Sequence, residues 1–175
     1  MITHVLVYLL IRLLLLSSLS KGDDLDVALA KVAGIYIDPN KQSGYEKSVF
    51  VTACNLGYLN HLHNLKCFMD KLRYKFLVIS METQVHEYIT QKTQMVSYLM
   101  NAGKFGEAAG TSAGFRDKHF NLITAKKIES VYEILRRGYD VIFSDLDVAL
   151  LDDFVSLLHL PGVDYVHSVN AVCEK

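Results

Sequence analysis

The sequence has little of what marks several common classes of protein. Lys+Arg total 18 against Asp+Glu 19, for a net charge of −1, so the basic excess of a nucleic-acid-binding domain is missing. Neither a Walker loop nor a GxGxxG turn occurs. With 51% hydrophobic residues, the chain is also not polar enough to be disordered. The composition therefore predicts one folded domain in 175 residues, with no nucleic-acid partner.

Cysteine is scarce, and its spacing is uninformative about metals. The three cysteines, Cys54, Cys67 and Cys173, form no CxxC and no zinc-binding pattern. An odd count leaves at least one thiol unpaired in any compartment. The sequence contains no N-x-S/T sequon, so glycosylation gives no sign of secretion. Buried or free thiols are the expectation, and their disulfide state is not predicted.

A long apolar segment does stand at the N-terminus. Ile2–Leu19 is almost wholly apolar and is interrupted by Arg12. A spanning helix needs roughly 20 apolar residues, and the small residues of Ser17–Ser20 suit a signal-peptide cleavage site, although no basic region precedes them. We therefore predict that residues 1–20 are a signal anchor or signal peptide, which directs the chain to the secretory pathway. The alternative is a buried helix of the fold.

The remaining chain alternates between apolar runs and amphipathic helices. Residues 21–45 are rich in glycine and polar residues, which predicts a linker or stem with a helical patch at Leu25–Val32. The main domain is then expected over 46–175. Four buried-strand runs are predicted at Val49–Ala53, Phe76–Ser80, Val141–Ser144 and Tyr165–Val169. Such alternation predicts an α/β fold, with a doubly wound, mainly parallel sheet and flanking helices.

The helices are predicted from their apolar spacing. The first places Leu62, Leu65 and Met69 on one face. The second is expected to bury Val85, Ile89, Val96 and Met100, and to end at Gly103 and Gly106. The third covers Asn121–Arg137 and is expected to bury Ile128, Val131, Tyr132 and Leu135, with Gly138 as its C-terminal cap. The glycine-rich Phe105–Gly114 predicts a surface loop rather than a phosphate cradle.

The densest chemical signal lies in Gly138–Phe154. Val141–Phe143 predicts a strand buried on both faces, directly followed by Asp145, Leu146 and Asp147. In parallel α/β sheets, ligands bind at the carboxyl ends of the strands. Two carboxylates there favour a divalent cation that bridges to phosphate, while Leu146 between them should point inward. A solvated turn or a helix cap is the alternative.

This order of elements resembles the nucleotide-diphospho-sugar transferase domain family. The resemblance rests on Lys127, on Leu135–Gly138 and on Tyr139–Val148, and it is densest between Phe120 and Asp153. It implies a GT-A-like fold and a metal-dependent glycosyltransferase, which moves a sugar from a nucleotide diphosphate sugar to a hydroxyl of a glycan or protein. It also implies that Asp145 and Asp147 bind a divalent cation, Mn²⁺ by expectation, against the donor's pyrophosphate.

The resemblance bears on several further residues. Lys127 matches a basic residue of the family, which implies nucleotide binding. An equal alternative is a lysine without a role, which packs its aliphatic stem on the apolar face and extends its ammonium into solvent. Lys126 shares its helix face with glutamates and is expected in solvent. Where the family has a basic residue, Asp and Pro, this chain has Asp152–Phe154, so the turn after the motif is not predicted. Thr52–Asn55 is a weaker candidate for contact with the base. His61 and His63 straddle their helix face and are poorly placed for a shared metal.

Two further functions stay open beside the enzyme. The family has a second half for the acceptor, whereas this sequence ends at Lys175, so we expect a donor-half fragment. A non-catalytic domain that binds a nucleotide sugar or glycan is therefore the main alternative. An aspartyl-phosphate phosphotransferase also carries Asp-x-Asp, but normally after an N-terminal strand. The resemblance places the chain in the Golgi membrane as a single-pass type II protein, or in the secreted fraction. Donor sugar, acceptor and stereochemical outcome are not predicted.

Overall fold

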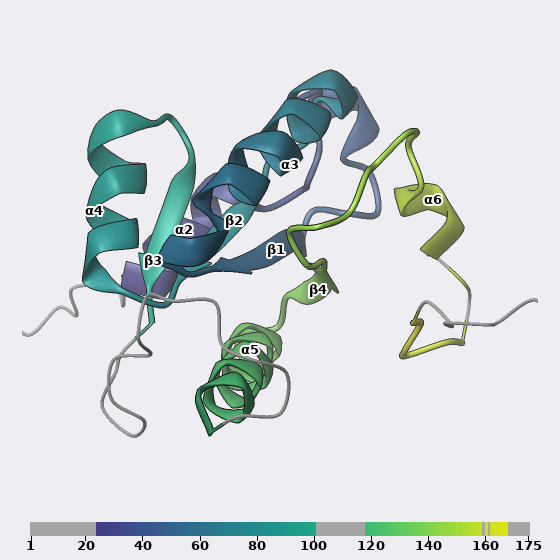
Figure 1. The fold of residues 1–175 in the computed structure, drawn as a ribbon. Coiled ribbons are helices and arrows are strands. Elements are labelled where there is room, and N and C mark those ends of the chain that lie inside the picture. Colours follow the sequence, from purple (N-terminus) through teal and green to yellow (C-terminus); the bar gives the residue numbers. More distant parts are fainter. Residues whose placement is uncertain (1–23, 101–117, 159, 161, 168–175) are drawn as a thin grey trace, which may run out of the picture.

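The structure is a computed structural model that describes residues 24–100, 118–158, 160 and 162–167. Its centre is a four-stranded sheet in the order β3-β2-β1-β4 (Figure 1). The strands are β1 (Ser48–Cys54), β2 (Leu77–Ser80), β3 (Val96–Leu99) and β4 (Asp140–Phe143). Every pairing is parallel, and Val51 of β1 lies opposite both Leu77 and Phe143. The prediction of a parallel α/β sheet is confirmed.

Helices cover both faces of this sheet. They are α2 (Asp24–Val32), α3 (Leu59–Leu72), α4 (Thr83–Lys92), α5 (Lys118–Leu135) and the short α6 (Val155–Leu158). Along β1, Phe50 and Cys54 join a core cluster with α3 and α4, whereas Val49 and Val51 join a second cluster with α2 and α5. Successive strand side chains point to opposite faces. The described domain is therefore three layers, with β1 buried throughout.

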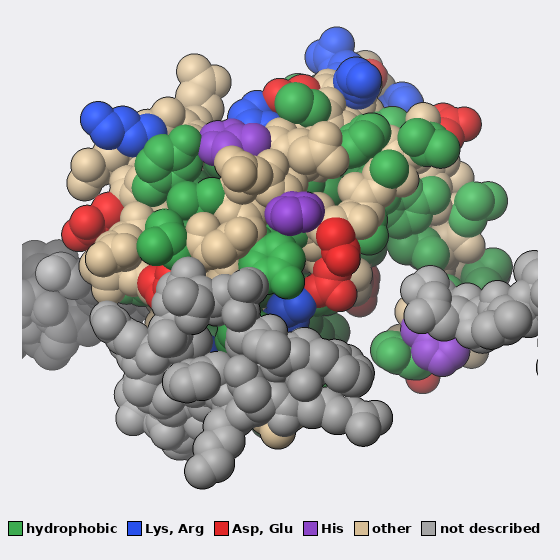
Figure 2. Space-filling model, viewed as in Figure 1, with side chains coloured by type: hydrophobic (Ala, Val, Ile, Leu, Met, Phe, Trp, Pro, Cys, Tyr) green, Lys and Arg blue, Asp and Glu red, His purple; other side chains and the backbone are tan. Residues whose placement is uncertain are grey.

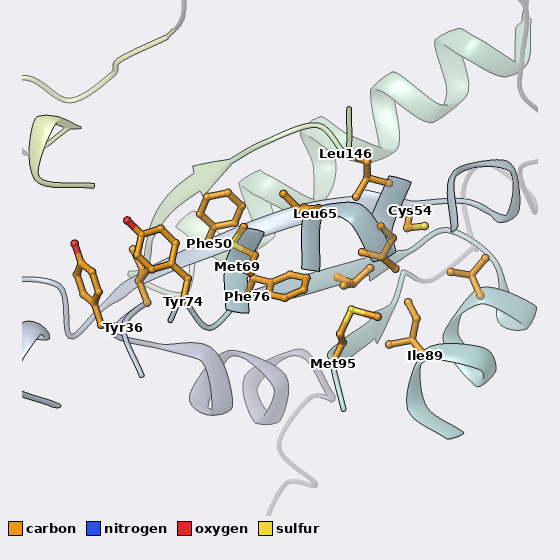
Figure 3. Packing of buried hydrophobic residues seen from close by; sticks show 14 of the residues in the cluster. Tyr36, Phe50, Cys54, Leu65, Met69, Tyr74, Phe76, Ile89, Met95 and Leu146 are labelled. Atoms are coloured by element: carbon orange, nitrogen blue, oxygen red, sulfur yellow. The ribbon is translucent and has the colours of Figure 1, made fainter. Parts of the chain in front are cut away.

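The two clusters extend the core in different directions. The cluster beneath α3 reaches from Leu146 and Cys54 at one end to Tyr74 and Tyr36 at the other (Figure 3). The second contains Leu25, Ala28, Leu29 and Val32 of α2. The helical patch predicted at Leu25–Val32 is thus present, but it packs into the core. Residues 24–45 consequently belong to the folded domain rather than to a stem, and a domain start near Glu46 is too late.

The prediction of one helix that includes Val96 and Met100 is wrong for the second half of that segment. Helix α4 ends at Lys92, and Val96–Leu99 forms the edge strand β3. The hydroxyl of Thr93 donates to the carbonyl of Ile89 at 2.7 Å and accepts from the amide of Met95 at 3.1 Å. Local side-chain bonds of this kind compete with helical ones, so Thr93 ends the helix. Gly103, Gly106 and Phe105–Gly114 lie outside the described residues.

Two strand predictions also need correction. Tyr165–His167 is exposed and forms no strand, while Val169 lies outside the described residues. Val141–Phe143 does form a strand, but β4 pairs only with β1 in the described sheet and its side chains are half-buried. Residues 1–20 are also outside the described part. None of the described helices is both long and apolar enough to cross a membrane.

Candidate functional site

The acidic pair lies at the carboxyl edge of the sheet. The amide of Ser144 donates to the carbonyl of Val51 at 3.1 Å, which continues the β4 pairing to the point where the pair begins. Asp145 and Asp147 are exposed, whereas Leu146 is buried in the cluster beneath α3. The inward direction predicted for Leu146 is confirmed. Figure 2 shows acidic side chains gathered over the loop that follows β4, with a basic side chain beside them.

Lys127 of α5 reaches this pair. Its Nζ donates to Oδ1 of Asp145 and lies 6.0 Å from the centroid of the Phe143 ring. Burial is partial, with 30% of the Lys127 side chain and 57% of the Asp145 side chain exposed. The structure therefore brings together two of the three predicted site residues. With the residues that the structure describes, the carboxylate of Asp147 makes no hydrogen bond or ion pair.

Helix α5 packs with a different face from the one predicted. Lys126 is 1% exposed and lies on the buried side with Ser130 and Ile134, so its expected place in solvent is wrong. The predicted core residue Ile128 is 66% exposed, and Tyr132 and Leu135 are exposed with it.

Two polar contacts accompany this orientation of α5. Arg137 donates from Nε to Asp26 of α2 at 2.8 Å, and Lys127 donates to Asp145. Both anchors project from the side of Ser130 and Ile134, at helical spacing. Gly138 follows at φ +76°, the left-handed conformation of a C-terminal cap.

Buried polar groups line the carboxyl end of β1. Among the described residues, neither Thr52 Oγ1 nor Asn55 Oδ1 has a hydrogen-bond partner, although both residues are buried. Nearby, Glu82 Oε2 accepts from the amide of Leu56 at 2.9 Å and holds the loops after β1 and β2 together. Buried polar atoms normally find a partner. Thr52 and Asn55, the weaker candidates for a base contact, therefore carry two unused polar atoms, but both atoms are buried beneath the ligand-binding edge.

Among the described residues, Cys54, Cys67, His61 and His63 take no part in this site. Burial, followed by the negative charge of Glu82, raises the pKa of the Cys54 thiol to about 12, so it stays protonated at neutral pH. Cys67 is exposed and free. His63 Nε2 lies 2.9 Å from the hydroxyl of Tyr88, and the His61 ring packs on Tyr58. Within the described ranges, no three His, Cys, Asp or Glu side chains are grouped to hold a metal ion.

The turn after the motif is organised by residues that the sequence did not single out. Asp153 accepts hydrogen bonds from the hydroxyls of Tyr36 at 2.9 Å and Tyr74 at 2.5 Å. Asp152 is exposed and accepts from the amide of Asp153. Phe154, which stands where the family has proline, packs its ring against Phe50 and Tyr74. Because both tyrosines are far from Asp153 in sequence, no local pattern could have revealed these contacts.

The donor set suits a hard divalent cation. Asp145 and Asp147 offer carboxylate oxygens, the ligand type that Mg²⁺ and Mn²⁺ prefer. Such ions are commonly held by one or two protein carboxylates together with substrate phosphates and water. The residues present therefore fit a cation that is shared with a phosphorylated ligand. The nearby Lys127 adds a positive charge of the kind that binds phosphate.

Comparison with known proteins agrees with this geometry. The sequence model of the family described as nucleotide-diphospho-sugar transferase matches residues 71–174, from the end of α3 past the acidic pair. No curated protein and no solved structure matches the chain. The parallel sheet with flanking helices is consistent with the GT-A-like α/β fold that the resemblance implied. Because the match spans more than half of the sequence, the chain belongs to the nucleotide-diphospho-sugar transferase family.

Proposed function

We propose that the chain is a metal-dependent glycosyltransferase, which transfers a sugar from a nucleotide diphosphate sugar to a hydroxyl of a glycan or protein. The observation that carries this proposal is the acidic pair Asp145 and Asp147 at the carboxyl edge of a parallel sheet, with Lys127 beside it. This edge is where open α/β sheets bind ligands. Membership of a nucleotide-sugar transferase family supports the same donor class.

Each residue has a defined part in this proposal. Asp145 and Asp147 hold the cation, with Mn²⁺ as the expected ion, and Lys127 contacts a phosphate oxygen of the donor. When bound, the metal neutralises the charge that develops on the departing nucleoside diphosphate. The chain's own contribution is thus to bind and orient the donor and to stabilise its leaving group.

Calorimetric titration tests this assignment. We expect uridine or guanosine diphosphate to bind the protein more tightly with Mn²⁺ than with chelator. Asp147→Ala should weaken the Mn²⁺-dependent binding by about 100-fold or more, since it removes a direct ligand, and loss of an outer partner alone costs a metal site about 10- to 100-fold. Asp145→Asn should weaken it less, because the amide still offers one oxygen. Asp70→Ala is the matched control, since Asp70 is an exposed carboxylate that pairs with Lys66 on α3.

Two outcomes would contradict the proposal. Equal nucleotide affinity with Mn²⁺ and with chelator would show that binding does not depend on a metal. Wild-type affinity in Asp147→Ala would show that Asp145 and Asp147 only form a structural turn. Turnover is then measured as nucleoside diphosphate released from candidate nucleotide sugars. Metal-dependent binding without any release, over a panel of donors and glycan acceptors, would favour the alternative of a non-catalytic binding domain.

A further inference from the structure

The chain that leaves the acidic pair runs back along the core. We call residues 147–154 the strap. Val148, Leu150 and Phe154 of the strap pack against the cluster beneath α3, which also buries Leu146 just before it and Val155 just after it. Figure 3 shows that this cluster extends from Leu146 to the tyrosines Tyr36 and Tyr74. The strap therefore begins at the carboxyl edge of the sheet and reaches the opposite end of the core.

At that far end, one carboxylate joins three segments of the chain. Oδ1 of Asp153 accepts from the hydroxyls of Tyr36 at 2.9 Å and Tyr74 at 2.5 Å, and from the amide of Val155 at 3.3 Å. Oδ2 lies 3.8 Å from Nζ of Lys41. Tyr36 and Tyr74 also form an isolated antiparallel bridge, and their rings pack edge to face at 5.3 Å. We call Asp153, Tyr36 and Tyr74 the clasp.

The charge states of the clasp are well defined at neutral pH. Burial raises the pKa of Asp153, but the hydrogen bonds from Tyr74 and Tyr36 lower it more, so the carboxyl stays ionised. Burial, then the hydrogen bond to Asp153, raises the pKa of Tyr36 to about 12, and the same causes raise the pKa of Tyr74. Both hydroxyls therefore remain protonated donors to an anion. Such charge-assisted bonds are stronger than those between neutral groups.

We propose that the clasp positions the acidic pair, by holding the far end of the strap that leaves Asp147. Asp145 has Lys127 as an anchor, whereas Asp147 makes no side-chain bond with the described residues. The direction of Asp147 thus depends on its backbone, which is fixed by buried Leu146 on one side and by the strap on the other. The inference rests on the proposed function of the pair as a metal site, and it makes Asp153, Tyr36 and Tyr74 positioning residues.

The test removes both hydroxyl donors and keeps the rings, in a Tyr36→Phe/Tyr74→Phe double variant of the full chain. We expect Mn²⁺-dependent binding of uridine or guanosine diphosphate to weaken by about tenfold, the lower end of what loss of outer partners costs a metal site. Binding measured with chelator should not change. Asp153→Asn, which keeps an acceptor oxygen, should lose less affinity than Asp153→Ala.

A matched control separates positioning from stability. Val85→Ala removes buried volume from the same cluster on α4, at a residue outside the strap, so it should lower thermal stability. We expect it to leave Mn²⁺-dependent affinity unchanged at temperatures where both proteins are folded. The inference would be overturned if Val85→Ala and the double variant, at similar thermal stability, lost the same Mn²⁺-dependent nucleotide affinity.

Backbone relaxation measured by NMR decides the inference independently of ligand. In the unliganded double variant, the order parameters of residues 146–150 should fall from the rigid range of about 0.85 toward about 0.6, while those of β1 stay unchanged. Unchanged order parameters at residues 146–150 would overturn the inference, even if the parent protein binds metal and nucleotide well. A parent protein without metal-dependent binding would instead contradict the proposed function, and the relaxation result would still decide whether the clasp orders the pair.

Discussion

The Lys127–Asp145 ion pair occupies oxygen atoms that a divalent cation would need. Lys127 Nζ donates to Oδ1 of Asp145. The positive charge of the ammonium offsets part of the electrostatic repulsion between the neighbouring carboxylates of Asp145 and Asp147. The pair is partly exposed, and pairs of this kind contribute little to stability. Under the proposed function, a divalent ion held by Asp145 and Asp147 would therefore replace the ammonium at small cost. Lys127 would then be available to contact a phosphate of the donor.

Replacement of Lys127 distinguishes these two roles. We expect Lys127→Gln to weaken Mn²⁺-dependent binding of a nucleoside diphosphate by about tenfold, through loss of one charged hydrogen bond. Binding of Mn²⁺ alone should be equal or slightly tighter, because a competing cation is gone. Titration calorimetry measures both quantities.

The control for this experiment is Lys66→Gln. Lys66 pairs with Asp70, and the exposed fractions of the two side chains, 31% and 60%, resemble the 30% and 57% of Lys127 and Asp145. It should change neither affinity. If Lys127→Gln also changes neither, Lys127 is a snorkelling lysine whose ammonium rests on Asp145 without a role in binding the donor.

At the scale of elements, local patterns predicted β1, β2, β4 and the acidic pair. A short apolar run is buried in a parallel sheet whatever packs on it, and the pair follows its strand directly. The packing face of α5 could not be predicted in this way. The helix carries an apolar stripe at Ile128, Tyr132 and Leu135 and a mixed one at Lys126, Ser130 and Ile134, and the structure buries the mixed one. Its anchors, Asp26 and Asp145, lie in other elements, so α5 alone does not reveal the choice.

The clasp illustrates the same limit. Tyr36 and Tyr74 lie 117 and 79 residues before Asp153, and only the folded chain brings the three together. In sequence, Asp153 was recognisable only as part of a motif that departs from its family in the neighbouring positions. By contrast, β3 was missed for a local reason. A hydroxyl at Thr93 ended the helix where apolar spacing alone continued it.

Helix α2 provides a stability test at this scale. Leu29 is 0% exposed and lies in the cluster shared with β1 and α5. Leu29→Ala should therefore lower the free energy of unfolding by about 2–5 kcal/mol, as truncation of a buried leucine does. Val27→Ala on the same helix is the control, because Val27 is 49% exposed and should change stability by less than about 0.5 kcal/mol. Denaturant unfolding measures the change in the free energy of unfolding for both variants. Equally small changes would mean that α2 is a stem and not part of the folded core.

At the scale of the whole molecule, the acidic pair is where the two outer layers meet. Asp145 is tied through Lys127 to α5, which packs on the same side of the sheet as α2. Leu146, next in sequence, is buried in the cluster beneath α3 on the other side. The alternation of side chains along an extended segment produces this division. The pair is therefore attached to both helical layers of the described domain.

The last prediction concerns where this domain is delivered. We expect residues 1–20 to direct the chain into the secretory pathway, because Ile2–Leu19 is apolar over nearly its whole length and has no amphipathic pattern. A full-length chain with a C-terminal reporter should be found in Golgi membranes or in the medium. Resistance of the membrane fraction to alkaline extraction would identify an anchor rather than a cleaved signal peptide. As a control, a Leu14→Arg/Leu15→Arg variant places two charges in the apolar run, each costing about 2.5–3.5 kcal/mol of insertion free energy, and should stay in the cytosol. A freely cytosolic parent chain of full length would contradict the prediction and would favour a buried N-terminal helix instead.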